Sequence, residues 1–184
     1  GDLISGSSAT RIHAIAISPD GKWLAVGSRD LVEVMDLGSR TWIKSATLLG
    51  DIQTLAFSND SKMLAIGSSN SKVVLLDSSN ASFSELLAFE TGGVPLALAF
   101  NPRDNLLAVG SDSNNVYLWD LELRQEVSRI LHSDAVTGVA FSPDGTQLTT
   151  VSRKLVQFWD ISRIRFVPTN ILENEACARL LENF

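Results

Sequence analysis

Apolar and polar positions follow one scheme along the chain, and the scheme is written four times. In each copy a short apolar run ends in a turn such as "SPDG", and a second apolar run follows directly. The copies are spaced by 40, 43 and 41 residues, measured from the first residue of each turn: Ser18, Ser58, Asn101 and Ser142. A second marker repeats at 41, 43 and 40 residues: Asp36, Asp77, Asp120 and Asp160. Two independent markers with one period indicate an internal repeat.

Within each copy the apolar residues follow the pattern of short buried β-strands. The strand before the turn has the same ending in every copy, as in Val139, Ala140 and Phe141. The strand after the turn ends in "AVGS", "AIGS", "AVGS" or "TTVS", where small residues indicate that a neighbouring layer approaches the backbone closely. A third strand ends in "VEVMD", "VVLLD", "VYLWD" or "VQFWD". A more polar segment follows, with the alternation expected of an outer strand that has one solvent-exposed face. Each copy therefore predicts a four-stranded antiparallel sheet.

The repeat length, the "AFSPDG" turn and the "LWD" and "FWD" strand endings resemble the WD-repeat β-propeller family, in which each repeat builds one blade. The resemblance covers about residues 9–165 and implies an all-β fold of four blades in a partial or composite ring. It divides a domain of residues 1–168 into blades at about 9–48, 49–90, 91–131 and 132–167.

In this family a His, a Ser or Thr, an Asp and a Trp bond together inside a blade, and the chain has only part of that set. A serine is present in every copy, but Met35 and Leu76 replace the Trp in the first two copies, and one histidine matches. The resemblance implies structural roles for Ser111, Trp119, His132, Ser152 and Trp159. Because no blade has the whole set, we expect apolar packing between sheets to provide most of the stability.

A blade is apolar on both faces, and four blades are fewer than the roughly seven with which family propellers usually close. An open arc would expose two apolar faces, each larger than the few hundred Å² that monomers tolerate. Three solutions remain: the chain is part of a longer propeller, two copies complete an eight-bladed ring, or four blades close with an unusual twist. Missing upstream blades and self-association are therefore both candidate partners.

The last residues, 169–184, change in character. Leu172, Ala176, Leu180 and Phe184 recur at helical spacing, and Asn170 can cap a helix. We expect a short C-terminal helix that docks on another surface, because a helix of this length is marginal alone. Its "EACARLLENF" also resembles the segment that follows the last blade in many bacterial WD-repeat proteins, which implies the C-terminal part of a bacterial propeller.

Composition narrows the classes of partner. The net charge of −6 argues against nucleic acid, whose binding needs concentrated Lys and Arg. No apolar run is long enough to span a membrane, and the first residues lack the pattern of a signal peptide. The single cysteine, Cys177, cannot form an internal disulfide, which fits a reducing compartment. We expect a cytoplasmic protein that binds neither nucleic acid nor membrane.

Candidate chemistry is sparse. His132, Ser133 and Asp134 are the residue types of a hydrolase triad, but adjacent residues seldom converge on one atom, so the structural role is favoured. Turn hydrogen bonding explains the four strand-ending aspartates better than a carboxylate cluster does. Two distant histidines and one cysteine make no zinc pattern. We predict no catalytic residue, metal or cofactor; the enzymatic alternative is a hydrolase with a central-channel site.

What remains is a binding surface. Propellers of this family usually bind partners across the face formed by the loops entering the first strand and by the hairpins between second and third strands. Alignment places nine residues near this loop face: Arg11, His13, Arg29, Asp51, Gln53, Ser69, Asp112, Thr137 and Arg153. Arginine binds carboxylates by planar multi-point contacts and often anchors interfaces. The resemblance implies a non-catalytic scaffold or sensor that binds a protein or peptide within a larger bacterial signalling protein, with an assembly-forming structural propeller as the alternative.

Overall fold

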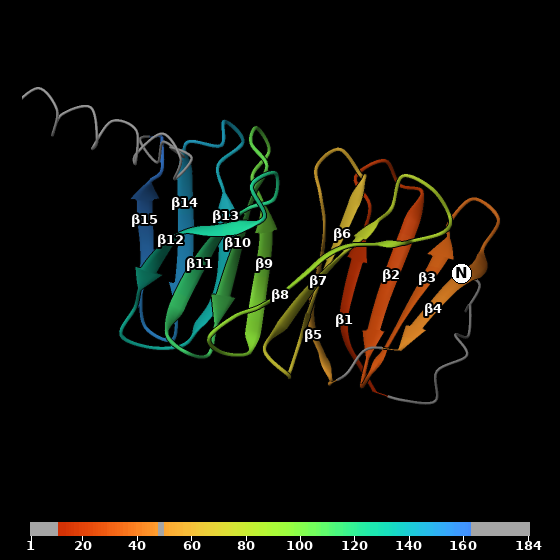
Figure 1. Cartoon of the computed structure of the whole chain (residues 1–184), viewed down its shortest axis with the longest axis horizontal. Helices are drawn as coiled ribbons and strands as arrows, with labels where there is room; N and C mark the ends of the chain where they lie inside the picture. Colours follow the sequence, from red (N-terminus) through yellow and green to blue (C-terminus); the bar gives the residue numbers. More distant parts are fainter. Residues whose placement is uncertain (1–10, 48–49, 163–184) are drawn as a thin grey trace, which may run out of the picture.

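The computed structural model describes residues 11–47 and 50–162, and these form four antiparallel sheets arranged side by side (Figure 1). Blade 1 contains β1 (Ile12–Ile17), β2 (Trp23–Ser28), β3 (Leu31–Asp36) and β4 (Thr41–Thr47). Blade 2 contains β5 (Ile52–Phe57), β6 (Met63–Ser68), β7 (Lys72–Asp77) and β8 (Glu85–Glu90). Blade 3 contains β9 (Pro95–Phe100), β10 (Leu106–Ser111), β11 (Asn115–Asp120) and β12 (Gln125–Leu131). Blade 4 contains β13 (Val136–Phe141), β14 (Gln147–Ser152) and β15 (Val156–Asp160).

Each sheet is a simple meander in which consecutive strands pair, as the repeat predicts. The all-β propeller architecture is therefore confirmed. Blade 4 has three strands in the part of the chain that the structure describes, where the repeat predicts four. The predicted C-terminal helix at 169–184 and the predicted end of blade 4 at residue 167 lie outside the described residues.

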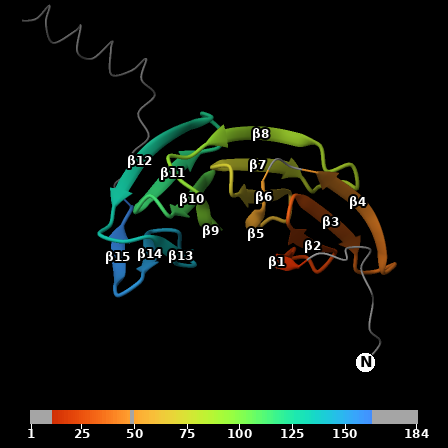
Figure 2. The same cartoon turned by 90° about the horizontal axis from the view of Figure 1, so that it is seen from below.

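The blades form an open arc (Figure 2). Their first strands β1, β5, β9 and β13 line the inner side, and β4, β8 and β12 lie on the outer side. Blades 1 and 4 stand at the two ends of the arc, so the four described blades do not close into a ring of their own. This excludes four-blade closure among the three solutions left open by the sequence.

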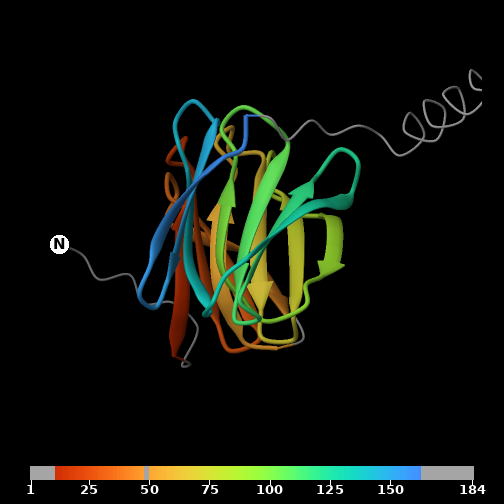
Figure 3. The same cartoon turned by 90° about the vertical axis from the view of Figure 1, so that its left-hand side faces the viewer.

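Three apolar junctions hold the arc together, and Figure 3 shows the sheets layered one behind another. Trp23, Ile52 and Phe57 belong to the cluster between blades 1 and 2. Phe100, Leu107 and Tyr117 belong to the next cluster, and Leu118, Val136 and Leu148 to the third. A fully buried side chain of this size contributes about 1.5–3 kcal/mol, so these clusters form the core of the protein.

The turn after the first strand has a common side-chain hydrogen-bond pattern in blades 1, 2 and 4. In blade 4 the Ser142 hydroxyl donates to the Asp144 carboxylate, and the Gln147 amide donates to Ser142 Oγ at 3.0 Å. The Ser142 hydroxyl and the Thr146 amide together lower the pKa of Asp144 to about 2. The same Ser-to-Asp bond recurs in blades 1 and 2. The "SPDG" turn that marks the repeat is thus held by hydrogen bonds between its own residues.

Candidate partner-binding face

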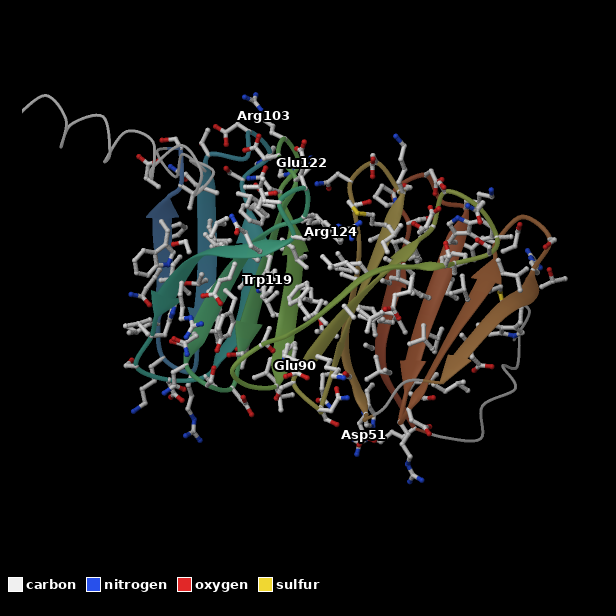
Figure 4. The ribbon with its side chains drawn as sticks, viewed as in Figure 1. Asp51, Glu90, Arg103, Trp119, Glu122 and Arg124 are labelled. Carbon is white, nitrogen blue, oxygen red and sulfur yellow. The ribbon has the colours of Figure 1, made fainter. Side chains whose placement is uncertain are left out.

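The loops predicted to form the binding face gather at one end of the strands. Figure 4 shows Asp51 and Glu90 at this end and Arg103 and Glu122 at the opposite end. The alternation of antiparallel strands explains this placement, because the loops before each first strand and the hairpins after each second strand leave the sheet on the same side.

Four of the nine predicted residues meet at the boundary of blades 1 and 2. The Ile52 amide donates to the Arg29 carbonyl at 2.6 Å, which ties the hairpin of blade 1 to the first strand of blade 2. The Asp51 amide donates to Ser69 Oγ, and the Ser69 amide donates to the Asp51 carbonyl, both at 2.8 Å. Gln53 Nε2 lies 3.4 Å from the Asp51 carbonyl. Main-chain hydrogen bonds and the side chains of Ser69 and Gln53 therefore fix this sector, while the Arg29 side chain is exposed.

The Asp112 side chain stabilises a loop of blade 3. Its Oδ1 accepts a hydrogen bond from the Val94 amide at 2.7 Å, and its own amide donates to the Val94 carbonyl at 3.1 Å. The side chain thus holds the loop that enters β9. Sequence alignment placed Asp112 on the face, and the structure adds a structural function for its carboxylate.

The other predicted residues lie near the ends of the arc. Arg11 and His13 belong to the entrance and first strand of blade 1, whereas Thr137 and Arg153 belong to blade 4; all four side chains are exposed. Ile12 pairs with Ser28, so Arg11 and His13 lie in the same blade as Arg29 and close to its hairpin. Because blade 4 stands at the other end of the arc (Figure 2), one copy of the chain does not bring Thr137 and Arg153 into a cluster with Arg29.

His132 lies in a structural network rather than beside an exposed nucleophile. Its Nε2 is 2.8 Å from Thr150 Oγ1, and Trp159 Nε1 donates to the same oxygen at 2.9 Å. Thr150 is fully buried. The Thr150 hydroxyl oxygen is thus shared by the two rings, and His132 Nδ1 lies 3.4 Å from the Ile130 carbonyl oxygen.

His132, Thr150 and Trp159 form a hydrogen-bonded trio, in which Thr150 takes the place expected of Ser152. Sequence alignment took Ser152 as the hydroxyl partner, but its main chain instead closes the hairpin with Leu155, at 2.9 and 3.4 Å. The corresponding Ser111 bonds to Ser113 Oγ at 2.6 Å and to the Asn115 carbonyl at 3.3 Å. Both serines sit at the end of the second strand, where the Ser111 hydroxyl bonds within the hairpin and the Ser152 main chain closes it.

Trp119 occupies the place of Trp159 in blade 3, but its surroundings are apolar. Its ring stacks on Phe89 of blade 2, with centroids 3.8 Å apart and planes at 20°. Trp119 Nε1 is buried without a hydrogen-bond partner in the described part of the chain, and Val109 stands where blade 4 has Thr150. The equivalent position is apolar in the other three blades, where it is Val26, Ile66 or Val109. The hydroxyl of Thr150 at this position was therefore the feature of the sequence that could have revealed the trio.

The four strand-ending aspartates are confirmed as turn residues. Oδ1 of Asp36, for example, accepts from the amides of Gly38 and Ser39 at 2.8 and 2.9 Å, which lowers the pKa of Asp36. Asp120 accepts in the same way from Glu122 and Leu123. Each carboxylate serves its own turn, in a different blade.

The end opposite the loop face has a hollow that sequence reasoning missed. At the junction of blades 1 and 2 the Asp20 amide donates to Ser61 Oγ, and at that of blades 3 and 4 Asn101 Nδ2 donates to the Gly145 carbonyl, both at 3.0 Å. Between blades 2 and 3 the turns instead border a hollow of about 180 Å³. Its lining includes Asp60, Met63, Phe100, Arg103, Asp104 and Leu121.

Metal-binding and membrane-spanning features were also sought. Within residues 11–47 and 50–162 no group of three or more His, Cys, Asp or Glu side chains is arranged to hold a metal ion. Over the same part of the chain there is no helix with the length and apolar character required to cross a bilayer.

Comparison with known proteins assigns the family. The model described as "WD domain, G-beta repeat" matches residues 3–31, 85–120 and 125–160, more than half of the chain. The chain belongs to the WD-repeat family. Proteins of this family generally serve as scaffolds for protein interactions. Two of the three matched segments run from β8 to β11 and from β12 to β15. Blade 2, in which Leu76 stands in place of Trp, lies largely between the first match and the second.

Several curated WD-repeat proteins are similar to this chain. WD repeat-containing protein 90 of Homo sapiens is 32% identical over 77% of the chain, which corresponds to 8% of that protein. Transducin beta-like protein 3 of Bos taurus is 29% identical over 92% of the chain and 22% of that protein. The U3 small nucleolar RNA-associated protein 18 homolog of Mus musculus is 26% identical over 83% of the chain and 29% of that protein. The chain therefore spans less than a third of these relatives.

Solved WD-repeat structures share the fold. The structure of U3-55K superposes with a TM-score of 0.77 over 87% of this chain and 52% of that chain, at 18% sequence identity. The crystal structure of RRP9 WD40 repeats gives the same TM-score and identity over 51% of its chain. At this identity the likeness establishes the propeller fold.

Proposed function

We propose that this chain is a non-catalytic interaction module that binds a protein or peptide across the loop face. The observation that carries the proposal is the sector of Arg29, Asp51, Gln53 and Ser69, in which hydrogen bonds of the main chain and of the Ser69 and Gln53 side chains fix the loops while the Arg29 side chain remains exposed. A preformed loop surface loses little entropy on binding, and an exposed guanidinium suits a carboxylate on the partner.

The proposal favours an acidic protein segment over nucleic acid. The chain has a net charge of −6, and phosphate backbones are bound by concentrated Lys and Arg. Two relatives are named for association with U3 small nucleolar RNA, which is a property of those proteins. On the ground of the single cysteine, the proposal further places the chain in the cytoplasm. On the ground of the "EACARLLENF" resemblance, it places the chain in a larger bacterial signalling protein, whereas the relatives named above are eukaryotic.

The test starts from peptides selected on the wild-type chain from a random display library. Their affinities are then measured by calorimetry on wild type, on the Arg29→Glu variant, and on Arg29→Glu combined with Arg153→Glu. We expect acidic peptides, and a loss of at least about tenfold for Arg29→Glu, because interface arginines are frequent hot spots.

Arg103→Glu is the matched control, since Arg103 is an exposed arginine at the opposite end of the strands (Figure 4). It should leave the affinities unchanged. A loss on Arg103→Glu with none on Arg29→Glu would move the binding surface to the other end. Selection of no peptide, together with tight binding of single-stranded RNA by the wild type, would contradict the proposed function.

A further inference from the structure

The hollow between blades 2 and 3 has a filled counterpart at the same end of the junction between blades 1 and 2. There the side chains of Trp23 and Phe83 are both buried, with ring centroids 5.4 Å apart and planes at 77°. Trp23 Nε1 also donates a hydrogen bond to the Ser78 carbonyl at 3.0 Å. Two aromatic rings and one indole hydrogen bond therefore fill this end of the first junction.

Blade 2 provides Phe83 from a long hairpin. The hairpin between β7 and β8 spans residues 78–84, whereas the hairpin between β11 and β12 spans only residues 121–124. Phe83 has a φ of 44°, in a region that bulky residues seldom adopt, yet its side chain is buried. Burial of the ring thus outweighs the backbone strain, so an aromatic side chain is strongly favoured in this space.

The junction between blades 2 and 3 lacks both rings at this end. Met63 stands at the position of Trp23, and Leu121 stands at the position of Ser78. The short hairpin at 121–124 contains no aromatic residue that could replace Phe83. Met63 and Leu121 both border the hollow of about 180 Å³. The hollow therefore lies where aromatic rings fill the neighbouring junction.

The third junction shows that the repeat does not leave such a space everywhere. Between blades 3 and 4 the corresponding residues, Leu106 and Ile161, are both buried. Asn101 Nδ2 also joins the two blades there through the Gly145 carbonyl. The space beside Met63 is thus specific to blades 2 and 3.

The size and lining of the hollow suit an indole ring. A cavity of about 150 Å³ is large enough to bind benzene. Phe100, Met63 and Leu121 provide apolar walls, and the thioether of a methionine packs well against an aromatic ring. Carboxylates of Asp60 and Asp104 also line the hollow, and an indole N–H can donate to such oxygens. Tryptophan therefore matches the hollow better than a purely apolar side chain.

The rim of the hollow favours a positive charge beside the ring. Asp60 and Asp104 belong to the lining together with one cation, Arg103, which interacts electrostatically with Asp144 of blade 4. Lys62 Nζ lies 3.6 Å from Asp60 Oδ2, but this pair is exposed and contributes little. Three carboxylates thus accompany two cations, in a chain with a net charge of −6.

From this comparison of junctions we propose that the hollow is a second binding site, separate from the loop face, which receives a tryptophan side chain of a partner protein with a lysine or arginine next to it. The tryptophan completes the junction of blades 2 and 3 from outside, as Trp23 and Phe83 complete the first junction from within. The adjacent cation pairs with the carboxylates of the rim.

The test uses the full chain and the peptide acetyl-Lys-Trp-Lys-amide, titrated and followed by NMR. The chain has two methionines, so the ring current of the bound indole should shift the methyl signal of Met63 and leave that of Met35, buried in blade 1, unchanged. The same peptide with leucine in place of tryptophan should bind at least about tenfold more weakly.

Two variants test the site, with affinities followed on the backbone amide signal of Leu121. Met63→Trp fills the hollow with the residue of blade 1 and should weaken peptide binding at least about tenfold, whereas the control Met63→Leu should bind nearly as tightly as wild type. Asp104→Lys, at an exposed position, should weaken binding of the peptide but not of uncharged N-acetyltryptophanamide. This second variant keeps the test valid if Met63→Trp does not fold.

The proposal is overturned if the Met63 methyl signal does not move, if the leucine peptide binds as tightly as the tryptophan peptide, or if folded Met63→Trp binds like wild type. Equal affinity of Asp104→Lys and wild type for the charged peptide would overturn the charge preference. Arg29→Glu should leave this binding unchanged, so a failure at the hollow is distinguished from a failure at the loop face.

Discussion

Blades 3 and 4 place the same residue types in different surroundings. Trp119 of blade 3 stacks on Phe89 of the preceding blade, whereas Trp159 of blade 4 donates a hydrogen bond to Thr150. Within the residues that the structure describes, blade 3 has a neighbour on both faces, and blade 4 has one on a single face. A repeated sequence position therefore does not have a fixed energetic role; its neighbours along the arc decide that role.

The comparison also separates two sources of stability. In blade 3 both faces belong to apolar clusters, which include Tyr117 on one side and Leu118 on the other. Blade 4 has one such cluster and a hydrogen-bonded trio of His132, Thr150 and Trp159. Substitutions at matched positions in these blades should therefore have unequal effects.

The largest difference is expected between Leu118→Ala and Phe158→Ala. Leu118 is fully buried at the junction of blades 3 and 4, so its truncation should reduce the free energy of unfolding by about 2–5 kcal/mol. Phe158 occupies the matching position on the open face, and its truncation should change that free energy by no more than about 0.5 kcal/mol. Urea denaturation measures both, and equal losses would contradict the open end of the arc.

The next largest effect on the free energy of unfolding is expected when Gly110 of blade 3 is replaced by valine, the residue that blade 4 has at this position. Gly110→Val places a branched side chain against Val136, whose methyl group and carbonyl oxygen leave no room for a Cβ atom. We expect a loss of about 1–3 kcal/mol in the free energy of unfolding. An unchanged urea midpoint would show that the junction can relax, and would contradict the close packing at Gly110.

Loss of the polar trio should have a comparable or smaller effect. Thr150→Val removes the oxygen shared by His132 and Trp159 and leaves His132 Nε2 and Trp159 Nε1, on two half-buried rings, without this partner, at a cost of about 1–3 kcal/mol. Thr149→Val is the matched control, because Thr149 lies next to it on the opposite side of the same strand. The role of the trio would be refuted if both variants unfolded at the same urea concentration.

The smallest effect is expected at an exposed turn. Hydrogen bonds in the folded state lower the pKa of Asp144 from 3.8 to about 2. The stabilisation from this carboxylate is therefore present above about pH 4 and is lost as the pH falls through 2. The difference in melting temperature between wild type and Asp144→Asn should shrink over that range, and a difference independent of pH would contradict the hydrogen-bonded turn.

The sequence was sufficient to predict the blades, because the residues that build them recur in every copy. Leu64, Leu107 and Leu148 are buried where the pattern required, while Leu24 in blade 1 is half-buried, and the aspartates at strand ends accept from turn amides. The partner of His132 was predicted wrongly as Ser152, since alignment followed the common serine. The unusual hydroxyl at Thr150 was the informative residue.

The sequence could predict which residues lie on the loop face, but not which of them lie close together. Loop positions follow from strand order, so Asp51 and Ser69 could be placed on one face. Their grouping with Arg29 depends on main-chain hydrogen bonds between blades, such as that from the Ile52 amide to the Arg29 carbonyl, and main-chain atoms are common to all residue types. The hollow beside Asp60 and Asp104 depends likewise on contacts between neighbouring repeats.

The central claim is that stability comes from apolar junctions between blades in an open arc, and amide hydrogen exchange tests it most directly. Strands covered on both faces, β6, β7, β10 and β11, should exchange slowest, while β1 and β15 at the ends should exchange fastest. Protection of β1 and β15 equal to that of β10 and β11 in a one-chain particle would contradict the account.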